Sequence, residues 1–456
     1  RRTNMVDLDS LLMQVDQSTS ELLNLHKELV KIESVNTGQM PTGNESNVAD
    51  LARQWLGNEG IESEVVESAP GRGNLIANMP GKSEKNKLLL VSHLDVVPVE
   101  DAGKWNYSPF GAELDNGRVY GRGTFDCKGL LASQMLSMAI LKRNGLKLSD
   151  NLVLVSGADE ESGGRYGLGW LAEKYPEKIQ SPLAINEGGG THVNVAGTTT
   201  YLMGIGEKGR LEIQLTIKGT SAHASTPWLG DNASYKLSSV LNRIQNYEAT
   251  RDTSVAIFQY LSSLAIEDVP TPDNVDWIIN ELQPKNPQLA SVLRALSRMT
   301  LTPTMVRGGI KSNSIPETIS LICDVRTLPH QDDRYVLDEL GRLFGDMDGI
   351  EIDVDYMAIP NSSDYDTSFA HSLKKATEVS LNRTDLNWVP SVSTGFTDSR
   401  FLRPLGTTTY GFNGMDPSDD PLLNRMHGTD ESIGVKSLTT GAKIMLALAV
   451  DVLDVD

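Results

Sequence analysis

The sequence has few cysteines, few basic side chains and no long apolar run. Its two cysteines, Cys127 and Cys323, are too few for a disulfide framework and form no CxxC pair, which fits a reducing compartment. The formal net charge of −19 argues against nucleic acid as a partner, because that partner requires clustered Lys and Arg. The longest apolar run, IMLALAV, is far shorter than the roughly 20 residues of a membrane span, and the N-terminal segment lacks the apolar stretch of a signal peptide. We expect a soluble, cytoplasmic protein that binds neither nucleic acid nor membrane.

The motifs of several common enzyme classes are missing as well. There is no GxSxG elbow, which disfavours a serine hydrolase, and no HExxH, which excludes a zincin with two ligands on one helix. No Walker A loop is present for a nucleoside triphosphate. Cys127 adjoins Asp126, but proximity alone does not make a nucleophile, and we interpret this cysteine as a packed thiol. At 456 residues the chain is too long for one compact core, so two domains are expected.

Short apolar runs alternate with amphipathic patterns over the first two hundred residues. Residues 87–92, 151–157 and 182–187 are apolar at successive positions, which is typical of parallel strands covered on both faces. Residues 129–145 lie between the first two runs and form a helical pattern closed by a glycine, so a βαβ unit is predicted. Residues 18–34 predict an opening helix.

The pattern changes near residue 205. Residues 210–219 and 319–328 alternate apolar and polar side chains, which indicates half-exposed antiparallel strands. Near residue 329 the earlier pattern returns, and residues 407–414 predict another buried strand. We therefore expect an α/β domain in two parts, 1–204 and 329–456, with a mixed, largely parallel sheet. A smaller α+β domain over 205–328 interrupts it.

Acidic and histidine side chains follow the predicted buried strands of the larger domain. In an open α/β sheet the ligand crevice lies beyond the carboxyl ends of the strands, so these side chains should meet at one rim. They are His93 and Asp95 after the first strand, Asp126 before the next helix, Glu160 and Glu161 after the second strand, Glu187 after the third, and His427 in a late loop.

Histidines combined with carboxylates suit a pair of divalent ions. Zinc binds imidazole nitrogen and carboxylate oxygen, and two ions close together need a bridging carboxylate and a bridging water. The adjacent Glu160 and Glu161 then make sense, because one can bind a metal while the other handles the proton of the water. Taken singly, each residue has a simpler reading: a solvated loop for the glutamates, a turn for Asp95. Their conjunction at strand ends favours the metal site.

The segments that carry these acidic and histidine residues resemble the di-zinc aminoacylase/carboxypeptidase family of metallopeptidases. That family includes acetylornithine deacetylase, succinyl-diaminopimelate desuccinylase, glutamate carboxypeptidase and carboxypeptidase S. The matching stretches occur in the family's order from about residue 90 to 431. They are SHLDVVP, SPFGAELDNGRVYGRGTFDCKG, ADEESGG, INEGGG, GTSAHASTP, SNSIPE, DVRTLP, STGFTDSR and HGTDE.

The resemblance implies a role for each residue at the rim. His93 and Glu187 would hold one Zn²⁺, Glu161 and His427 the other, with Asp126 bridging, Glu160 as general base and Asp95 orienting His93. The position of Glu187 is Asp in some relatives and Glu in others, which leaves Co²⁺ or Mn²⁺ open. The smaller domain would be a ferredoxin-like lid that also forms a homodimer.

The implied reaction is hydrolysis of an amide bond next to a free carboxylate, in a peptide or an N-acyl amino acid. His223 would stabilise the oxyanion, and in dimeric relatives it enters the neighbouring subunit's site. Arg326 and Arg400 would hold the carboxylate, unless they form salt bridges with Asp324 and Asp398, and Asn313 would be a further polar contact. The alternative is a catalytically silent metal- or peptide-binding protein, which the presence of Glu160 disfavours.

Overall fold

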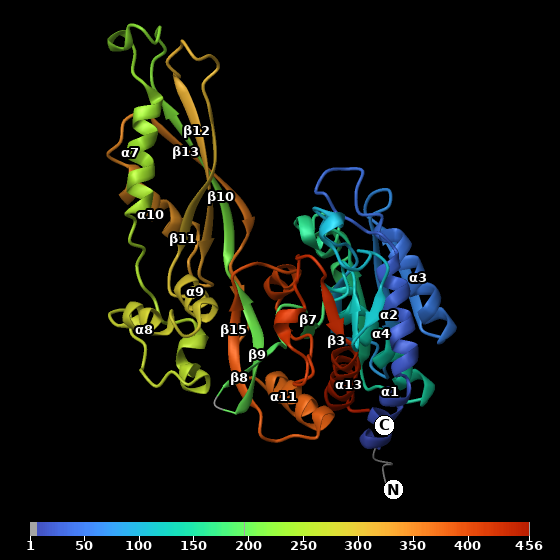
Figure 1. Ribbon diagram of the computed structural model, residues 1–456. Coiled ribbons are helices and arrows are strands. Elements are labelled where there is room, and N and C mark those ends of the chain that lie inside the picture. Colours follow the sequence, from blue (N-terminus) through green and yellow to red (C-terminus); the bar gives the residue numbers. More distant parts are fainter. Residues whose placement is uncertain (1–6, 196, 456) are drawn as a thin grey trace.

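The computed structural model describes residues 7–195 and 197–455 and contains two main sheets of different character (Figure 1). The large sheet and most helices lie together, and a narrower sheet extends away from them on the left of the view. This arrangement confirms the expectation of an α/β body interrupted by a smaller α+β part.

The large sheet is mixed, with parallel strands at its centre. Its strands are β1 (Glu62–Glu67), β2 (Gly73–Met79), β3 (Asn86–His93), β6 (Asn151–Gly157), β7 (Leu183–Asn186), β8 (His192–Val195), β9 (Thr198–Glu207), β14 (Asn361–Ser362), β15 (Asn387–Ser393) and β16 (Thr408–Gly411). In space they follow the order β1-β2-β6-β3-β7-β16-β9-β14, with β15 and β8 also paired to β9. Strand β3 is parallel to β6 and β7, and β7 is parallel to β16, whereas β1, β2 and β6 pair antiparallel. The apolar runs that predicted buried parallel strands are these central strands.

Helices cover both faces of the large sheet. Leu88 and Leu90 of β3 belong to one core, and the intervening Leu89 and Val91 belong to the core on the opposite face. A strand buried on both faces is apolar at every position, which explains the uninterrupted run. The first core includes α1 (Leu8–Gln17), α2 (Thr19–Lys31), α3 (Glu45–Asn58), α4 (Lys128–Arg143), α11 (Ser368–Leu381) and α13 (Val435–Val452), and the second includes α5 (Leu168–Lys174), α6 (Pro176–Ile179) and α12 (Ser399–Leu402). Helices α2 and α4 confirm the two predicted helices.

The smaller sheet is antiparallel and half exposed. It contains β10 (Gly209–Lys218), β11 (Thr300–Gly308), β12 (Thr318–Thr327) and β13 (Ile350–Ala358) in the order β11-β12-β10-β13. The alternating apolar side chains of β10 and β12 form one core with α7 (Ala233–Gln245) and α10 (Asp333–Phe344). The chain order β10-α7-β11-β12-α10-β13 is the ferredoxin-like βαββαβ arrangement.

Two features of this region differ from the expected division at residues 205 and 328. Strand β13 and helix α10 lie beyond 328, because residues 350–358 also alternate and complete the smaller sheet. Helices α8 (Val275–Leu282) and α9 (Pro287–Leu296) lie within the expected insert, yet Val275 and Leu293 belong to the core of the large sheet. The domain boundaries stay a prediction, and we propose a second boundary near residue 358.

A third, short sheet connects two distant segments near the end of β3. It consists of β4 (Glu113–Asp115), β5 (Arg118–Tyr120) and β17 (Ser432–Gly434), and Ser432 pairs with Tyr120. The 3-10 helices are η1 (Ala102–Lys104), η2 (Glu160–Ser162), η3 (Pro227–Leu229), η4 (Ala256–Leu264), η5 (Arg403–Leu405) and η6 (Pro421–Leu423). Within the described part of the chain, none of the helices has the combination of length and apolar character that crossing a bilayer requires.

Candidate metal centre

The carboxyl ends of the central strands bring the first group of donors together. His93 ends β3, Glu187 directly follows β7, and Asp126 lies just before α4. The His93 Nε2 atom lies 2.9 Å from Asp126 Oδ1 and 3.4 Å from Glu187 Oε1. The structure therefore gathers these three predicted residues into one buried cluster, which the side chain of Cys127 also borders.

A second group of donors shares Asp126 with the first. His427 Nε2 lies 3.0 Å from Asp126 Oδ2 and 3.2 Å from Glu161 Oε2. Asp126 thus turns one oxygen to each histidine. Within each group the donor atoms lie within 4.8 Å of one another. The arrangement offers two adjoining places for a cation, joined by one carboxylate.

Burial sets the protonation of the carboxyl groups at this rim. Burial raises the pKa of Glu160 well above its usual range, and the nearby Glu187 raises it further. Burial also raises the pKa values of Glu161 and Glu187 to about 7. For Asp126 burial acts in the same direction, but hydrogen bonds from His427 and His93 outweigh it and lower the pKa. Crowded acidic groups in a buried site favour any cation that can neutralise them.

Asp95 supports both the histidine and the two adjacent glutamates. The backbone N–H groups of Glu160 and Glu161 donate to its two carboxylate oxygens, each at 3.1 Å. His93 Nδ1 lies 3.0 Å from the main-chain oxygen of Asp95 and 3.4 Å from its Oδ1. Asp95 thus contacts His93 through both its backbone oxygen and its carboxylate, and the carboxylate also holds the turn of the two glutamates.

A residue that the sequence reasoning missed holds the segment carrying Asp126. Glu431 accepts hydrogen bonds from the backbone N–H groups of Gly123, Phe125 and Asp126. Its Oε2 atom also accepts a hydrogen bond from Arg122 Nη1 at 2.7 Å. Glu431 is fully buried and lies in the HGTDE stretch, four residues after His427. The signal available in the sequence was the position of this acid within a stretch that resembles the family.

The structure places His223 and Asn313 apart from the metal donors. His223 is exposed, its Nδ1 lies 2.7 Å from Ser225 Oγ, and its segment pairs with Ser314. The main-chain oxygen of Asn313 accepts from the N–H of Ala224. His223 lies between β10 and α7, and Asn313 lies between β11 and β12. These two connections are at the end of the smaller sheet farther from the large sheet (Figure 1).

The two candidate arginines lie in contrasting surroundings. Arg326 forms the salt bridge with Asp324 that the sequence left open, with Nε 2.7 Å from Oδ1. Arg400 is buried between the rings of Phe396 and Phe401, at 4.1 and 4.7 Å from their centroids. Among the described residues, no hydrogen-bond partner faces the guanidinium of Arg400.

Asp398 has the same lack of partners as its neighbour Arg400. Neither of its two carboxylate oxygens has a hydrogen-bond partner within the described part of the chain. Burial raises the pKa of Asp398 to about 8, although the charge of Arg400 acts in the opposite direction. Arg400 is therefore a buried cation without a hydrogen-bonded anion, unlike Arg326.

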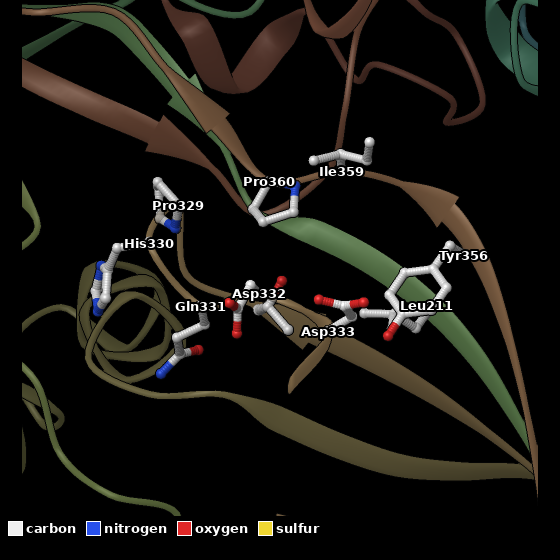
Figure 2. A pocket seen from close by; sticks show the side chains of 10 residues that line it. Leu211, Pro329, His330, Gln331, Asp332, Asp333, Tyr356, Ile359 and Pro360 are labelled. Carbon is white, nitrogen blue, oxygen red and sulfur yellow. The ribbon is translucent and has the colours of Figure 1, made fainter. Parts of the chain in front are cut away.

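A cavity of about 420 Å³ lies against the smaller sheet, where β10, β12 and β13 meet the segment of residues 329–333 (Figure 2). Leu211, Tyr356, Ile359 and Pro360 line it together with residues 329–333. None of the predicted site residues is among its lining residues. The metal donors instead contact one another at the rim, where His93 and Asp126 are buried, Glu161 and Glu187 are half-buried, and His427 is exposed.

The sequence matches a known protein family over most of its length. The profile of "Peptidase family M20/M25/M40" matches residues 89–451. A probable succinyl-diaminopimelate desuccinylase of Staphylococcus epidermidis is 25% identical over 411 residues, covering 90% of this chain and 93% of that protein. The human N-fatty-acyl-amino acid synthase/hydrolase PM20D1 is 26% identical over 403 residues, covering 85% of this chain and 78% of that protein.

Solved structures share the same fold. The M20 family metallo-carboxypeptidase Sso-CP2 from Sulfolobus solfataricus superposes with a TM-score of 0.72 at 19% identity, covering 94% of this chain and 98% of that one. The YXEP protein of Bacillus subtilis, described as a dinuclear metal binding peptidase from the M20 family, gives a TM-score of 0.59 at 15% identity, covering 96% and 99%. The whole architecture, including the smaller sheet, is therefore common to these proteins.

Proposed function

The chain belongs to peptidase family M20/M25/M40 and is a metallopeptidase or amidohydrolase, and on that premise we propose that it uses two metal ions to cleave an amide bond next to a free carboxylate. The observation that carries the proposal is the sharing of Asp126 between the two histidines, with the buried Glu160 in the same crowded set of acids. A single ion would not need both donor groups.

The donor set fits two divalent ions. Each group combines one imidazole nitrogen with carboxylates, the ligands that zinc takes in catalytic sites, and Co²⁺ or Mn²⁺ would accept them too. The Oε1 atom of Glu161 is buried and has no hydrogen-bond partner among the described residues, as expected of an atom that faces a cation. We assign His93 and Glu187 to one ion, Glu161 and His427 to the other, and Asp126 to both. When bound, two such ions supply Lewis acidity and a water of lowered pKa.

The chain's own residues carry the proton and the developing charge. Glu160, which is buried and adjoins Glu161, accepts the proton of the attacking water and delivers it to the departing amine. Asp95 keeps Glu160 and Glu161 in place through its two backbone hydrogen bonds. His223 donates to the oxyanion of the tetrahedral intermediate.

The substrate is a peptide or an N-acyl amino acid with a free carboxylate. A guanidinium suits this group, because its planar fork donates two parallel hydrogen bonds to a carboxylate. Arg400 is the stronger candidate, since its donors are unpartnered, and Arg326 and Asn313 would add contacts from the smaller sheet. The resemblance to PM20D1, an N-fatty-acyl-amino acid synthase/hydrolase, supports an acyl amino acid as one of the substrates to test.

A homodimer through the smaller sheet would bring His223 to a site. Strand β11 is an edge strand whose residues 302–308 are exposed, so its backbone can pair with a second copy. Two free, buried cysteines support a cytoplasmic location.

Metal content and amide hydrolysis, measured together, test the proposed function. Purified protein should contain close to two zinc, cobalt or manganese ions per chain by mass spectrometry. It should cleave dipeptides and N-acyl amino acids, lose this activity on chelation, and regain it when metal is restored.

Substrates with an amidated C-terminus are the matched control, and their cleavage at equal rates would remove the carboxylate from the proposal. Two metals without cleavage of any substrate would favour the silent binding protein. No metal after reconstitution would refute the proposed centre.

A further inference from the structure

Three buried side chains from the first part of the chain meet behind the turn that carries Glu160 and Glu161. Arg72 lies directly before β2, Glu45 begins α3, and Asn36 lies in the loop after α2. Their exposed fractions are 1%, 0% and 3%. All three precede residue 89, where the family profile begins to match.

Arg72 joins two carboxylates that come from different elements. Its Nη2 donates to Glu45 Oε1 at 2.8 Å and to Asp159 Oδ1 at 2.9 Å. The backbone N–H of Asp159 donates to the same Glu45 oxygen at 3.2 Å. Asp159 is thus held through both its backbone and its side chain, one residue before Glu160.

Asn36 connects this cluster to Asp95. Its Nδ2 donates to Asp159 Oδ1 at 3.0 Å and to Asp95 Oδ2 at 2.8 Å. Asp95 in turn accepts the N–H groups of Glu160 and Glu161. An unbroken series of hydrogen bonds therefore runs from Arg72 to the two glutamates.

The backbone at Asp159 needs such support. Its φ of +65° lies in the left-handed region, which a residue with a Cβ adopts less readily than glycine and which contacts such as these stabilise. That conformation sets the direction in which the chain presents Glu160 and Glu161 after β6. Without Arg72, both Glu45 and Asp159 would remain buried without their countercharge, which is strongly unfavourable.

We propose that Arg72 is a positioning residue for the proposed reaction: through Glu45, Asp159 and Asn36 it fixes the turn that presents Glu160 and Glu161. The inference rests on the proposed function, because it assigns to this turn a base and a metal ligand. Arg72 itself touches neither substrate nor metal.

Substitution of Arg72 tests the proposal through kinetics and cobalt binding. Arg72→Met should lower kcat or cobalt affinity about 10- to 100-fold, as removal of supporting hydrogen bonds around metal sites does, with little change in KM. The visible absorption spectrum of the Co²⁺-loaded protein should also change, because it reports ligand geometry. Arg72→Lys, which keeps the charge but not the fork, should recover part of kcat, and it replaces Arg72→Met as the test if that variant does not fold.

A double variant separates positioning from folding. In Arg72→Met/Glu45→Leu the buried pair is replaced by apolar side chains, so much of the lost thermal stability should return. The rate should stay low, because Asp159 still lacks its arginine. Recovery of both stability and rate would show that Arg72 acts only on folding and would overturn the proposal.

Arg143→Met is the matched control. Arg143 also joins two carboxylates from different elements, Glu21 of α2 and Glu59 after α3, but at the C-terminal end of α4 and with a third of its side chain exposed. It should lose some stability and keep wild-type kcat and cobalt spectrum. An Arg72→Met protein with unchanged kcat and spectrum would overturn this inference alone, whereas a wild-type protein that takes up no cobalt would overturn the proposed function and this inference together.

Discussion

The strand ends of the large sheet and the outer loops of the smaller sheet carry their polar residues in opposite ways. At the strand ends His93, Asp126 and Glu160 are buried and engage side chains from distant segments. On the smaller sheet His223 is exposed, and the hydrogen bonds of its ring among the described residues are to Ser225 in its own loop. The first region is organised in advance, whereas His223 could take its proposed role only by domain movement or by coming from another copy.

This contrast divides the proposed catalytic work. A preorganised set of charges inside a low-dielectric site can stabilise a transition state without reorganising during the reaction. An exposed histidine on a separate sheet can instead respond to substrate, because its arrival completes the site. Disabling one residue of each region measures how strongly the two depend on each other.

Glu160→Gln should have the largest effect. The amide has nearly the same shape but cannot accept the proton of the water, so kcat should fall about 10²- to 10⁴-fold. Metal content should remain that of the wild type, because Glu160 is not among the proposed ligands. Measuring kcat and metal content on the same sample tests whether Glu160 is the base. A variant that still hydrolyses substrate would show that the base is another residue.

His223→Ala should have the next largest effect, because it removes one donor to the oxyanion. We expect kcat to fall about 10²- to 10³-fold while the metal content stays nearly constant. Mixing this variant with Glu160→Gln sharpens the comparison. If His223 comes from a second copy, mixed dimers contain one complete site and activity reappears. If each chain uses its own His223, the mixture stays inactive.

Sequence patterns predicted the buried region better than the exposed one. The apolar run of residues 87–92 and the terminal His93 were readable, because a doubly covered parallel strand leaves a plain signal and its carboxyl end has a fixed place in the sheet. The residue at which the smaller domain ends was not readable from the sequence, because the alternation of apolar and polar residues in β13 was missed. Helices α8 and α9 were also misleading, because they pack on a different core from their neighbours in the chain.

Long-range hydrogen bonds were also beyond the reach of sequence patterns. Arg72 meets Asp159 across 87 positions, and no local spacing indicates that two such residues share a hydrogen bond. Glu431 could have been found, since it lies in a stretch already matched, but its contacts to the backbone near Asp126 required the fold.

Acid should weaken the buried region through His26. This residue lies in α2 with its Nε2 2.9 Å from the main-chain oxygen of Thr124, and burial lowers its pKa to about 4. The unfolded chain therefore binds a proton that the folded chain refuses between about pH 6.5 and 4, so stability falls as the pH falls through that window. We expect a loss of about 2 kcal/mol between pH 7 and 5 from this group.

Urea unfolding of wild type and His26→Gln at the two pH values measures this contribution. Glutamine can still donate to the Thr124 carbonyl, but it does not titrate. Between pH 7 and pH 5 the free energy of unfolding should therefore fall by about 2 kcal/mol more in the wild type than in His26→Gln. An equal pH dependence in both proteins would mean that His26 does not titrate as its burial indicates.

The smallest effects should come from the two arginines, and their ratio compares the two regions directly. Lysine keeps the charge but cannot form the two parallel hydrogen bonds of a guanidinium. Arg400→Lys should raise KM about 10-fold for substrates with a free carboxylate, since Arg400 is unpartnered and buried. Arg326→Lys should raise it only about 3-fold, because Asp324 already occupies that guanidinium.

An amidated substrate distinguishes carboxylate binding from general damage, because it lacks the group that either arginine would hold. With the amidated substrate, the KM of both variants should therefore equal that of the wild type. If Arg326→Lys has the larger effect, the carboxylate is bound from the smaller sheet, and its movement toward the metal centre would set substrate affinity as well as rate. If Arg400→Lys has the larger effect, the buried region supplies most of the substrate recognition, and the smaller sheet contributes chiefly to kcat through His223.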